Sequence, residues 1–268
     1  MSYDRPIVSR RTQTQSLSTN KPWTVRSASR ITRPVVQSRA LPLTRRFEIE
    51  WLGPDAFPED LTKIAPALPA FEEAFAAFTH GTLIQTLEGP VAVEDLVPGA
   101  QIARPDGTGA ELRWKGAITI VPGAPTLRPD AERLYRVTAD AFGLARPARD
   151  VLLGPDARIL NRDPNVRSSV AADAAFVPVS SLVDGMSVIE VTPVAPTRVY
   201  HLVTKSHETI IAGGLEVETF TPRSDMAEGL SHEMMDVFLG LFPHLSAMRD
   251  FGRARWPRLS REMMETIA

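Results

Sequence analysis

The residues of this chain that could do chemistry near neutral pH are its hydroxyl side chains and its five histidines, because it contains no cysteine. That absence removes thiolate nucleophiles, thiolate metal ligands and disulfides. The stretch LGPDARIL (153–160) has the form of a site, since two short apolar runs flank a Gly-Pro-Asp corner. The corner carries no Ser, Thr or His, so it supplies neither a nucleophile nor a general base.

Three histidines, His80, His201 and His207, lie inside the β-rich part of the chain. His201 and His207 are six residues apart and, with Glu208, form only a weak metal-binding pattern, because no third ligand motif accompanies them. We therefore predict no metal site. The chain also lacks a phosphate-binding glycine loop in a strand–helix context, and we predict no cofactor. The two later histidines of the chain are expected on helix surfaces.

The elements that would position these groups are mostly strands. From Gly81 to about Pro222, short β-branched runs alternate with Pro and Gly turns at intervals of roughly ten residues. This texture is typical of a compact all-β domain. Upstream, RRFEIEWL (45–52) predicts a strand and PALPAFEEAFAAF (66–78) a short helix that starts at Pro69.

Downstream of Pro222 the pattern becomes helical. Apolar residues recur at helical spacing from Leu230 to Met248, and Pro243 should end or kink this helix near Phe242. We expect the apolar stripe to pack on the β domain.

A ten-residue repeat lies inside the β-rich part. VEDLVPGAQI (93–102) matches VSSLVDGMSV (179–188), with Gly99 aligned to Gly185. Each copy predicts a one-turn helix or turn, a glycine with positive φ, and then a strand. The repeat indicates a domain of two related halves about a pseudo-twofold axis.

We divide the chain into a basic disordered arm (1–46), a strand and helix lead-in (47–75), a β domain (76–222) and a helical C-terminal extension (223–268). The arm holds ten Lys or Arg and one acid, a net charge of +9, so the rest of the chain carries −11. Such an arm is either a solubilising tail, a transit peptide, or an attachment site for nucleic acid or anionic membrane. Neither a transmembrane segment nor a secretory signal is recognisable. A cytoplasmic location is favoured, and non-classical export stays open.

The order of these blocks resembles the Hint domain of hedgehog proteins and inteins, in particular the bacterial Hint group common in alphaproteobacteria. AFTHGTLIQTLEGPVAVEDLVPGAQI (77–102) is similar to the opening block of that family, and LGPDARIL to its central block. VYHLVTKSHETIIAGGLEVETF (199–220) is similar to its closing block. The resemblance covers roughly residues 76–222 and implies a mainly β fold of two related subdomains.

The resemblance also implies a reaction, because Hint domains attack the peptide bond just before themselves with a Cys, Ser or Thr at their first residue. A Thr and a His in the central block assist this attack. Here the nucleophile position is Ala77, and the Thr and His positions are Gly154 and Ala157. The closing His-Asn pair of inteins would fall near Glu218 and Thr219. We therefore expect the domain to be catalytically degenerate. We also expect Ala77, Gly154 and Ala157 to lie in one cleft.

The other polar residues that we assign to the former cleft are Thr79, His80, Asp156, Arg158, His201 and His207. Thr79 comes two residues too late for the cyclic intermediate of the family's reaction, and Thr82 is read as a strand residue.

Three functions follow from this interpretation. The first is a Hint domain without self-cleavage, more a structural or interaction module than an enzyme, whose cleft holds a protein or peptide segment. The second is an autoprocessing protein that uses a non-standard nucleophile. The third is an adaptor that binds nucleic acid or anionic membrane through the arm.

Overall fold

The computed structural model of the protein describes residues 43–267, apart from the side chains of residues 227 and 228. The predictions for residues 1–42 of the arm lie outside the described residues. Residues 44–46, which we grouped with the arm, belong to the first strand, where Arg45 Nε is 2.5 Å from Oε1 of the buried Glu72.

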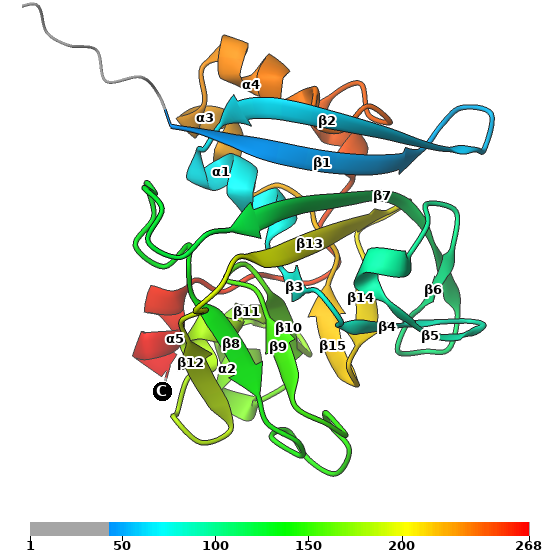
Figure 1. Ribbon diagram of the computed structural model, residues 1–268. Helices are drawn as coiled ribbons and strands as arrows, with labels where there is room; N and C mark the ends of the chain where they lie inside the picture. Colours follow the sequence, from blue (N-terminus) through cyan, green and yellow to red (C-terminus); the bar gives the residue numbers. More distant parts are fainter. Residues whose placement is uncertain (1–42, 268) are drawn as a thin grey trace, which may run out of the picture. The chain divides into compact units, whose positions relative to one another are not determined.

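Fifteen strands build the described part of the chain (Figure 1). They are β1 (Thr44–Leu52), β2 (Pro58–Pro66), β3 (Phe78–Thr79), β4 (Leu83–Thr86), β5 (Gly89–Ala92), β6 (Gln101–Ala103), β7 (Gly109–Ile120), β8 (Leu134–Val137), β9 (Val151–Leu153), β10 (Arg158–Asn161), β11 (Ala175–Pro178), β12 (Val188–Val191), β13 (Thr197–Thr204), β14 (Thr209–Ala212) and β15 (Leu215–Glu218).

The helices are short. The α-helices are α1 (Pro69–Glu72), α2 (Pro164–Val170), α3 (Met226–Gly229), α4 (His232–Leu239) and α5 (Arg261–Ile267), and the 3₁₀ helices are η1 (Glu73–Phe75), η2 (Val93–Asp95), η3 (Val179–Leu182) and η4 (Met248–Phe251). None of the helices in the described residues is long and apolar enough to span a membrane.

The long strands β7 and β13 run antiparallel side by side through the middle of the molecule (Figure 1). β7 also pairs with β6 near its start and with β1 near its centre. On its other edge β13 pairs with the two-residue strand β3, which pairs in turn with β9. The predicted mainly β fold is confirmed.

The sequence repeat recurs in the structure as two similar units. In the first, the hairpin β4–β5 leads into η2, Gly99 with φ of +101° and β6. In the second, the antiparallel pair β10–β11, which α2 connects, leads into η3, Gly185 with φ of +76° and β12. In each unit the N–H group that opens the 3₁₀ helix donates to the carbonyl just before the first strand of the pair: Val93 to Thr82, and Val179 to Ala157. The two predicted halves therefore share a local architecture.

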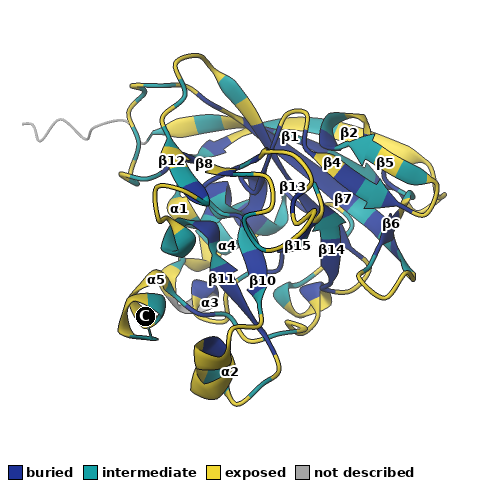
Figure 2. Ribbon diagram, turned by 90° about the horizontal axis from the view of Figure 1, so that it is seen from below, coloured by how far each residue is buried: buried dark blue, intermediate teal, exposed yellow. Residues whose placement is uncertain are grey.

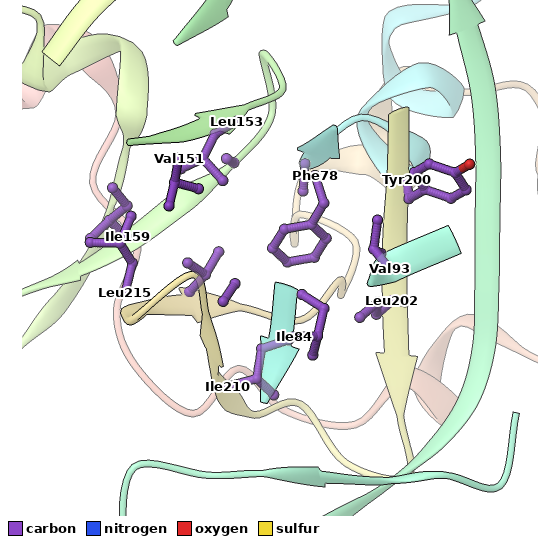
Figure 3. Close-up of a cluster of buried hydrophobic side chains, with 14 of the residues drawn as sticks. Phe78, Ile84, Val93, Val151, Leu153, Ile159, Tyr200, Leu202, Ile210 and Leu215 are labelled. Carbon is purple, nitrogen blue, oxygen red and sulfur yellow. The ribbon is translucent and has the colours of Figure 1, made fainter. Parts of the chain in front are cut away.

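The two largest apolar cores of the described residues flank the central strands. One lies inside the β domain and contains Phe78, Ile84, Leu153 and Leu202 (Figure 3). The other is aromatic and joins the lead-in, Trp114 of β7 and the C-terminal extension. Figure 2 shows that buried residues follow β7, β13, β10 and β14.

The aromatic core explains the position of the C-terminal extension. Trp114 stacks on Phe242 with ring centroids 4.6 Å apart, and its indole N–H donates to the carbonyl of Leu241 at 2.9 Å. Phe75 of η1 meets Trp114 edge to face at 5.0 Å. The apolar stripe thus packs on the β domain as expected, although α4 ends at Leu239, before the predicted end near Phe242.

Two expectations for the flanking segments need correction. Strand β2, from Pro58 to Pro66, was not anticipated, and it pairs with β1 along its whole length. His244 does not lie on a helix surface: it is in the turn after α4, where both ring nitrogens are buried without a hydrogen-bond partner among the described residues. His232, by contrast, is exposed on α4 as expected.

Candidate functional site

The start and the end of the β domain meet on strand β13. The N–H group of Ala77 donates to the carbonyl of Tyr200 at 2.9 Å, and that of Phe220 donates to the carbonyl of Leu202 at 2.8 Å. These acceptors are two residues apart, so the chain enters and leaves the domain at neighbouring points.

The corner after β9 lies directly on the peptide bond between Ala76 and Ala77. Phe78 of β3 stands opposite Leu153 of β9, and the N–H group of Gly154 donates to the carbonyl of Ala77 at 2.8 Å. The N–H group of Asp156 donates to the carbonyl of Ala76 at 3.0 Å. The two backbone segments that the resemblance assigns to the reaction, residues 76–77 and the corner at 154–157, are therefore in direct contact.

Gly154 is the tightest point of this arrangement. A Cβ atom built on Gly154 would lie 2.2 Å from the carbonyl oxygen of Ala76 and 2.8 Å from its carbonyl carbon. Atoms of a fixed backbone cannot approach so closely, so the Ala76–Ala77 peptide already fills the space of a side chain here. A threonine at this position would require the peptide or the corner to move.

Ala77 and Ala157 belong to the same buried core, and neither has exposed surface. Gly154 connects them, since its N–H group bonds to Ala77 and its carbonyl accepts from Ala157 N–H at 3.3 Å. The three positions expected in one cleft do lie together, but methyl groups and core side chains fill the space between them.

The hydroxyl groups nearest to Ala77 in sequence are engaged. Thr79 donates to the carbonyl of Leu152 at 2.7 Å, and Thr82 lies 3.3 Å from the same oxygen. Both threonines are buried. These bonds tie β3 to β9, and among residues 43–267 neither hydroxyl is hydrogen-bonded to a base that would activate it.

Asp156 holds the corner in place. Its carboxylate forms a two-pronged ion pair with the Arg128 guanidinium, at 2.6 and 3.0 Å. Burial acts to lower the pKa of Arg128, but the charge and hydrogen bonds of Asp156, together with the charges of Asp130 and Glu72, raise it above its ordinary value. Arg128 comes from the connection between β7 and β8, so a remote loop fixes the backbone donor that touches Ala76.

His207 and Glu218 form a buried pair at the end of the last strand, β15. His207 Nε2 is 2.8 Å from Glu218 Oε1, which also accepts from Arg258 Nε at 2.6 Å. Burial alone would raise the pKa of Glu218, but the hydrogen bond from His207 and the charge of Arg258 hold it below its usual range. His207 Nδ1 accepts from the N–H group of Arg255 at 2.9 Å, so the C-terminal extension covers this pair.

His201 lies between aromatic rings in the interior. Its ring meets those of Phe78 and Phe220 at centroid distances of 5.8 and 5.4 Å. Burial, aided by the positive charge of Arg258, lowers the pKa of His201 to about 3. The imidazole is therefore neutral at pH 7 and adds no charge to the domain.

Glu208 does not join the histidines. Its carboxylate binds Arg104 and Arg255, each at 2.9 Å. Across residues 43–267, no group of three His, Asp or Glu side chains is arranged to hold a metal ion.

The residues assigned to the former cleft separate into three environments. Thr79 and His80 line a cavity of about 660 Å³ beside β4, β9 and β14, where the exposed ring of His80 is 3.4 Å from Glu94. His201 and His207 are buried in the interior. Arg158 lines a second cavity, of about 780 Å³, on the side of the C-terminal extension. The structure therefore brings Asp156 to the peptide bond but does not gather the other residues into one cleft.

Sequence reasoning did not identify Glu218 as a buried charged residue. It named Glu218 only because the closing His-Asn pair of inteins would fall near this position. The Gly213–Gly214 turn sets a hairpin register in which Thr209 stands opposite Glu218. Side chains alternate along extended chain, so His207 falls on the same face as Glu218. This register could have predicted the His207–Glu218 pair from the sequence. No pattern in the sequence indicates the third partner, Arg258, which lies forty residues away.

The comparison with protein-family models agrees with this architecture. The family model described as "Hint domain" matches residues 76–224, more than half of the chain. Among solved structures, the chain is similar to the solution structure of a bacterial intein-like domain from Clostridium thermocellum, with 16% sequence identity and a TM-score of 0.38. That match covers 55% of this chain and 99% of the other. A search of curated proteins gave no match.

Proposed function

Because this chain belongs to the Hint domain family, we propose that it is a Hint domain that does not cut its own backbone and that keeps its upstream segment as a permanent part of the fold. It acts as a structural or interaction module rather than as an enzyme. The opening block further favours the bacterial group within the family.

One observation carries this proposal. The carbonyl of Ala76, which the family's reaction would attack, occupies the space where Gly154 would bear a side chain. Gly154 is therefore fitted to an intact peptide bond. An attack at this bond would need a nucleophile on one side and a proton donor on the other, and the flanking residues Ala77 and Ala157 offer only methyl groups.

The upstream segment supports the same conclusion. β1 pairs with β7, and Phe47, Phe71 and Phe75 are fully buried in the aromatic core. Fully burying an aromatic or aliphatic side chain of this size stabilises a fold by roughly 1.5–3 kcal/mol. Residues 43–76 thus belong to the domain, and a cut at Ala76 would leave them bound.

The test is intact-mass measurement of the full-length protein under denaturing conditions, since a cut segment would stay attached in a native measurement. We expect a single species of 29.4 kDa after long incubation from pH 5 to 9, with and without added thiol or hydroxylamine. The variant Ala77→Cys supplies a family nucleophile, and it too should stay uncut, because the assisting groups at 154 and 157 are still missing.

The alternative is autoprocessing through a non-standard nucleophile. It predicts a fragment ending at Ala76, and such a fragment from the wild-type chain would refute our proposal. Thr79 and Thr82 are the residues to replace first in that event, as Thr79→Val and Thr82→Val.

A further inference from the structure

The cavity of about 780 Å³ lies between the β domain and the C-terminal extension. Arg158 of β10, residues 221–225 after β15 and parts of residues 248–263 line it. Its lining contains one carboxylate, Asp225, and five arginines: Arg158, Arg223, Arg249, Arg253 and Arg258. Such a wall has an excess of positive charge that attracts anions.

Two of these arginines build the wall itself. Arg223 binds both carboxylate oxygens of Asp225, at 3.1 and 2.7 Å. Arg258 donates to Glu218 and, at 2.8 Å, to the carbonyl of Thr221. Their guanidinium groups are oriented by these bonds, which leaves the binding of a ligand to the other three.

Arg158 has donors to spare. Its side chain is largely buried, yet for its five N–H donors the structure shows one hydrogen bond, to the carbonyl of Leu259 at 3.2 Å. The carboxylates of Glu73 and Glu218 form ion pairs with it at 3.7 Å, a distance too long for hydrogen bonds. A largely buried guanidinium that lines a cavity and keeps unused N–H donors is suited to an anionic oxygen.

Arg249 and Arg253 stand at the mouth of the same cavity. The closest carboxylate to Arg249 is Asp250 at 3.9 Å, and that group already accepts the N–H groups of Ser246 and Ala247. Arg253 is exposed and pairs with no carboxylate among residues 43–267 for which the structure describes a side chain. Both guanidiniums are placed to meet a ligand as it enters.

The rest of the lining is mainly apolar, with the hydroxyl side chains of Thr221, Ser224 and Ser260 among it. Met248, Phe251, Trp256 and Met263 line the cavity between the arginines. A volume of this size accommodates a small organic molecule, and the mixture of apolar wall and few charged groups is typical of ligand sites. Inorganic phosphate alone would leave the apolar part of the cavity unused.

We propose that this cavity binds a small organic anion, whose phosphate or carboxylate group is held by Arg158, Arg249 and Arg253 and whose apolar body packs against Trp256 and its apolar neighbours. The inference goes beyond the function proposed above and does not depend on the absence of cleavage.

The test is isothermal titration of the full-length protein with phenyl phosphate, benzoate, inorganic phosphate and benzyl alcohol. We expect saturable 1:1 binding of an aryl anion, tighter than inorganic phosphate, with no binding of the neutral alcohol. A preference between phenyl phosphate and benzoate identifies the head group. The double variant Arg249→Ala/Arg253→Ala should weaken binding about tenfold, because charge-assisted hydrogen bonds are lost.

The matched control is Arg46→Ala/Arg136→Ala, which removes the same charge from exposed positions that line no part of this cavity. It should leave the affinity within about twofold, since distant surface charges are screened by salt. Absence of saturable binding of both aryl anions would overturn the proposal. So would an equal loss of affinity in the two double variants, or inorganic phosphate binding as tightly as phenyl phosphate.

Discussion

At the residue scale, Gly154 is the most constrained position beside the Ala76–Ala77 peptide bond. Glycine is required here for lack of space and not for backbone flexibility. A Cβ atom at this position would lie 2.2 Å from the carbonyl oxygen of Ala76. Side-chain volume at this position and an undistorted Ala76–Ala77 peptide exclude each other.

We therefore expect Gly154→Ala to destabilise the protein by about 1–3 kcal/mol, the usual cost of overpacking a core. Urea denaturation followed by tryptophan fluorescence measures this change. Gly229→Ala is the matched control, since a Cβ built there meets nothing within 4 Å, and its stability should stay within about 0.5 kcal/mol of wild type. Equal stability of Gly154→Ala and wild type would contradict the close approach.

At the scale of elements, one segment of the C-terminal extension packs across the end of the β domain, and we call this segment, residues 255–259, the strap. Residues 255–259 run along β11, where Phe176 N–H donates to Pro257 and Leu259 N–H donates to Phe176. Along the same strap Arg258 reaches Glu218. The strap therefore joins the last strand to the extension through buried charge as well as backbone bonds.

Arg258→Met should lower the free energy of unfolding by about 3 kcal/mol, because the buried Glu218 carboxylate loses its closest cation and keeps only His207 and, at 3.7 Å, Arg158. Chemical denaturation measures the loss. Arg261→Met serves as the control: its i,i+4 pair with Glu265 is exposed and should be worth no more than about 0.5 kcal/mol. If both variants lose the same small amount, the strap is not held by this pair.

The success of sequence reasoning also differs between elements. The repeat around Gly99 and Gly185 was predictable, because a glycine with positive φ between a turn and a strand leaves a local signature. Strand β2 was not predictable, because it is a largely polar run with a proline at each end, Pro58 and Pro66. Its extended conformation depends on pairing with β1. The Asp156–Arg128 and Glu218–Arg258 pairs were invisible for another reason: each joins segments far apart in sequence.

At the scale of the whole molecule, buried ionisable groups make stability depend on pH. The folded pKa of His201 is about 3, below its ordinary value of 6.5, so between these limits the unfolded chain binds more protons. Stability is therefore full above about pH 6.5 and falls as the pH drops toward 3. Glu218, whose pKa is lowered from 4.5, adds a loss in the same direction below that value.

Unfolding free energies measured at pH 7, 6 and 5 should fall by up to about 1.4 kcal/mol per pH unit below 6.5 through His201. The variant His201→Gln should reduce this slope, because glutamine does not titrate. A slope of the same sign remains through His244, whose pKa burial lowers to about 4. His80→Gln, at an exposed ring, should keep the wild-type slope. A slope unchanged in His201→Gln would show that this histidine is not the group that titrates.

The aromatic core has a consequence for how the protein is made. Phe47 and Phe75 leave the ribosome before their partners Trp114 and Phe242. During synthesis the early aromatic surface is therefore exposed, and contacts of such long sequence separation form slowly. We infer that this core is completed only after Phe242 has been synthesised, and that until then the nascent segment around Phe71 exposes apolar surface that a chaperone would bind.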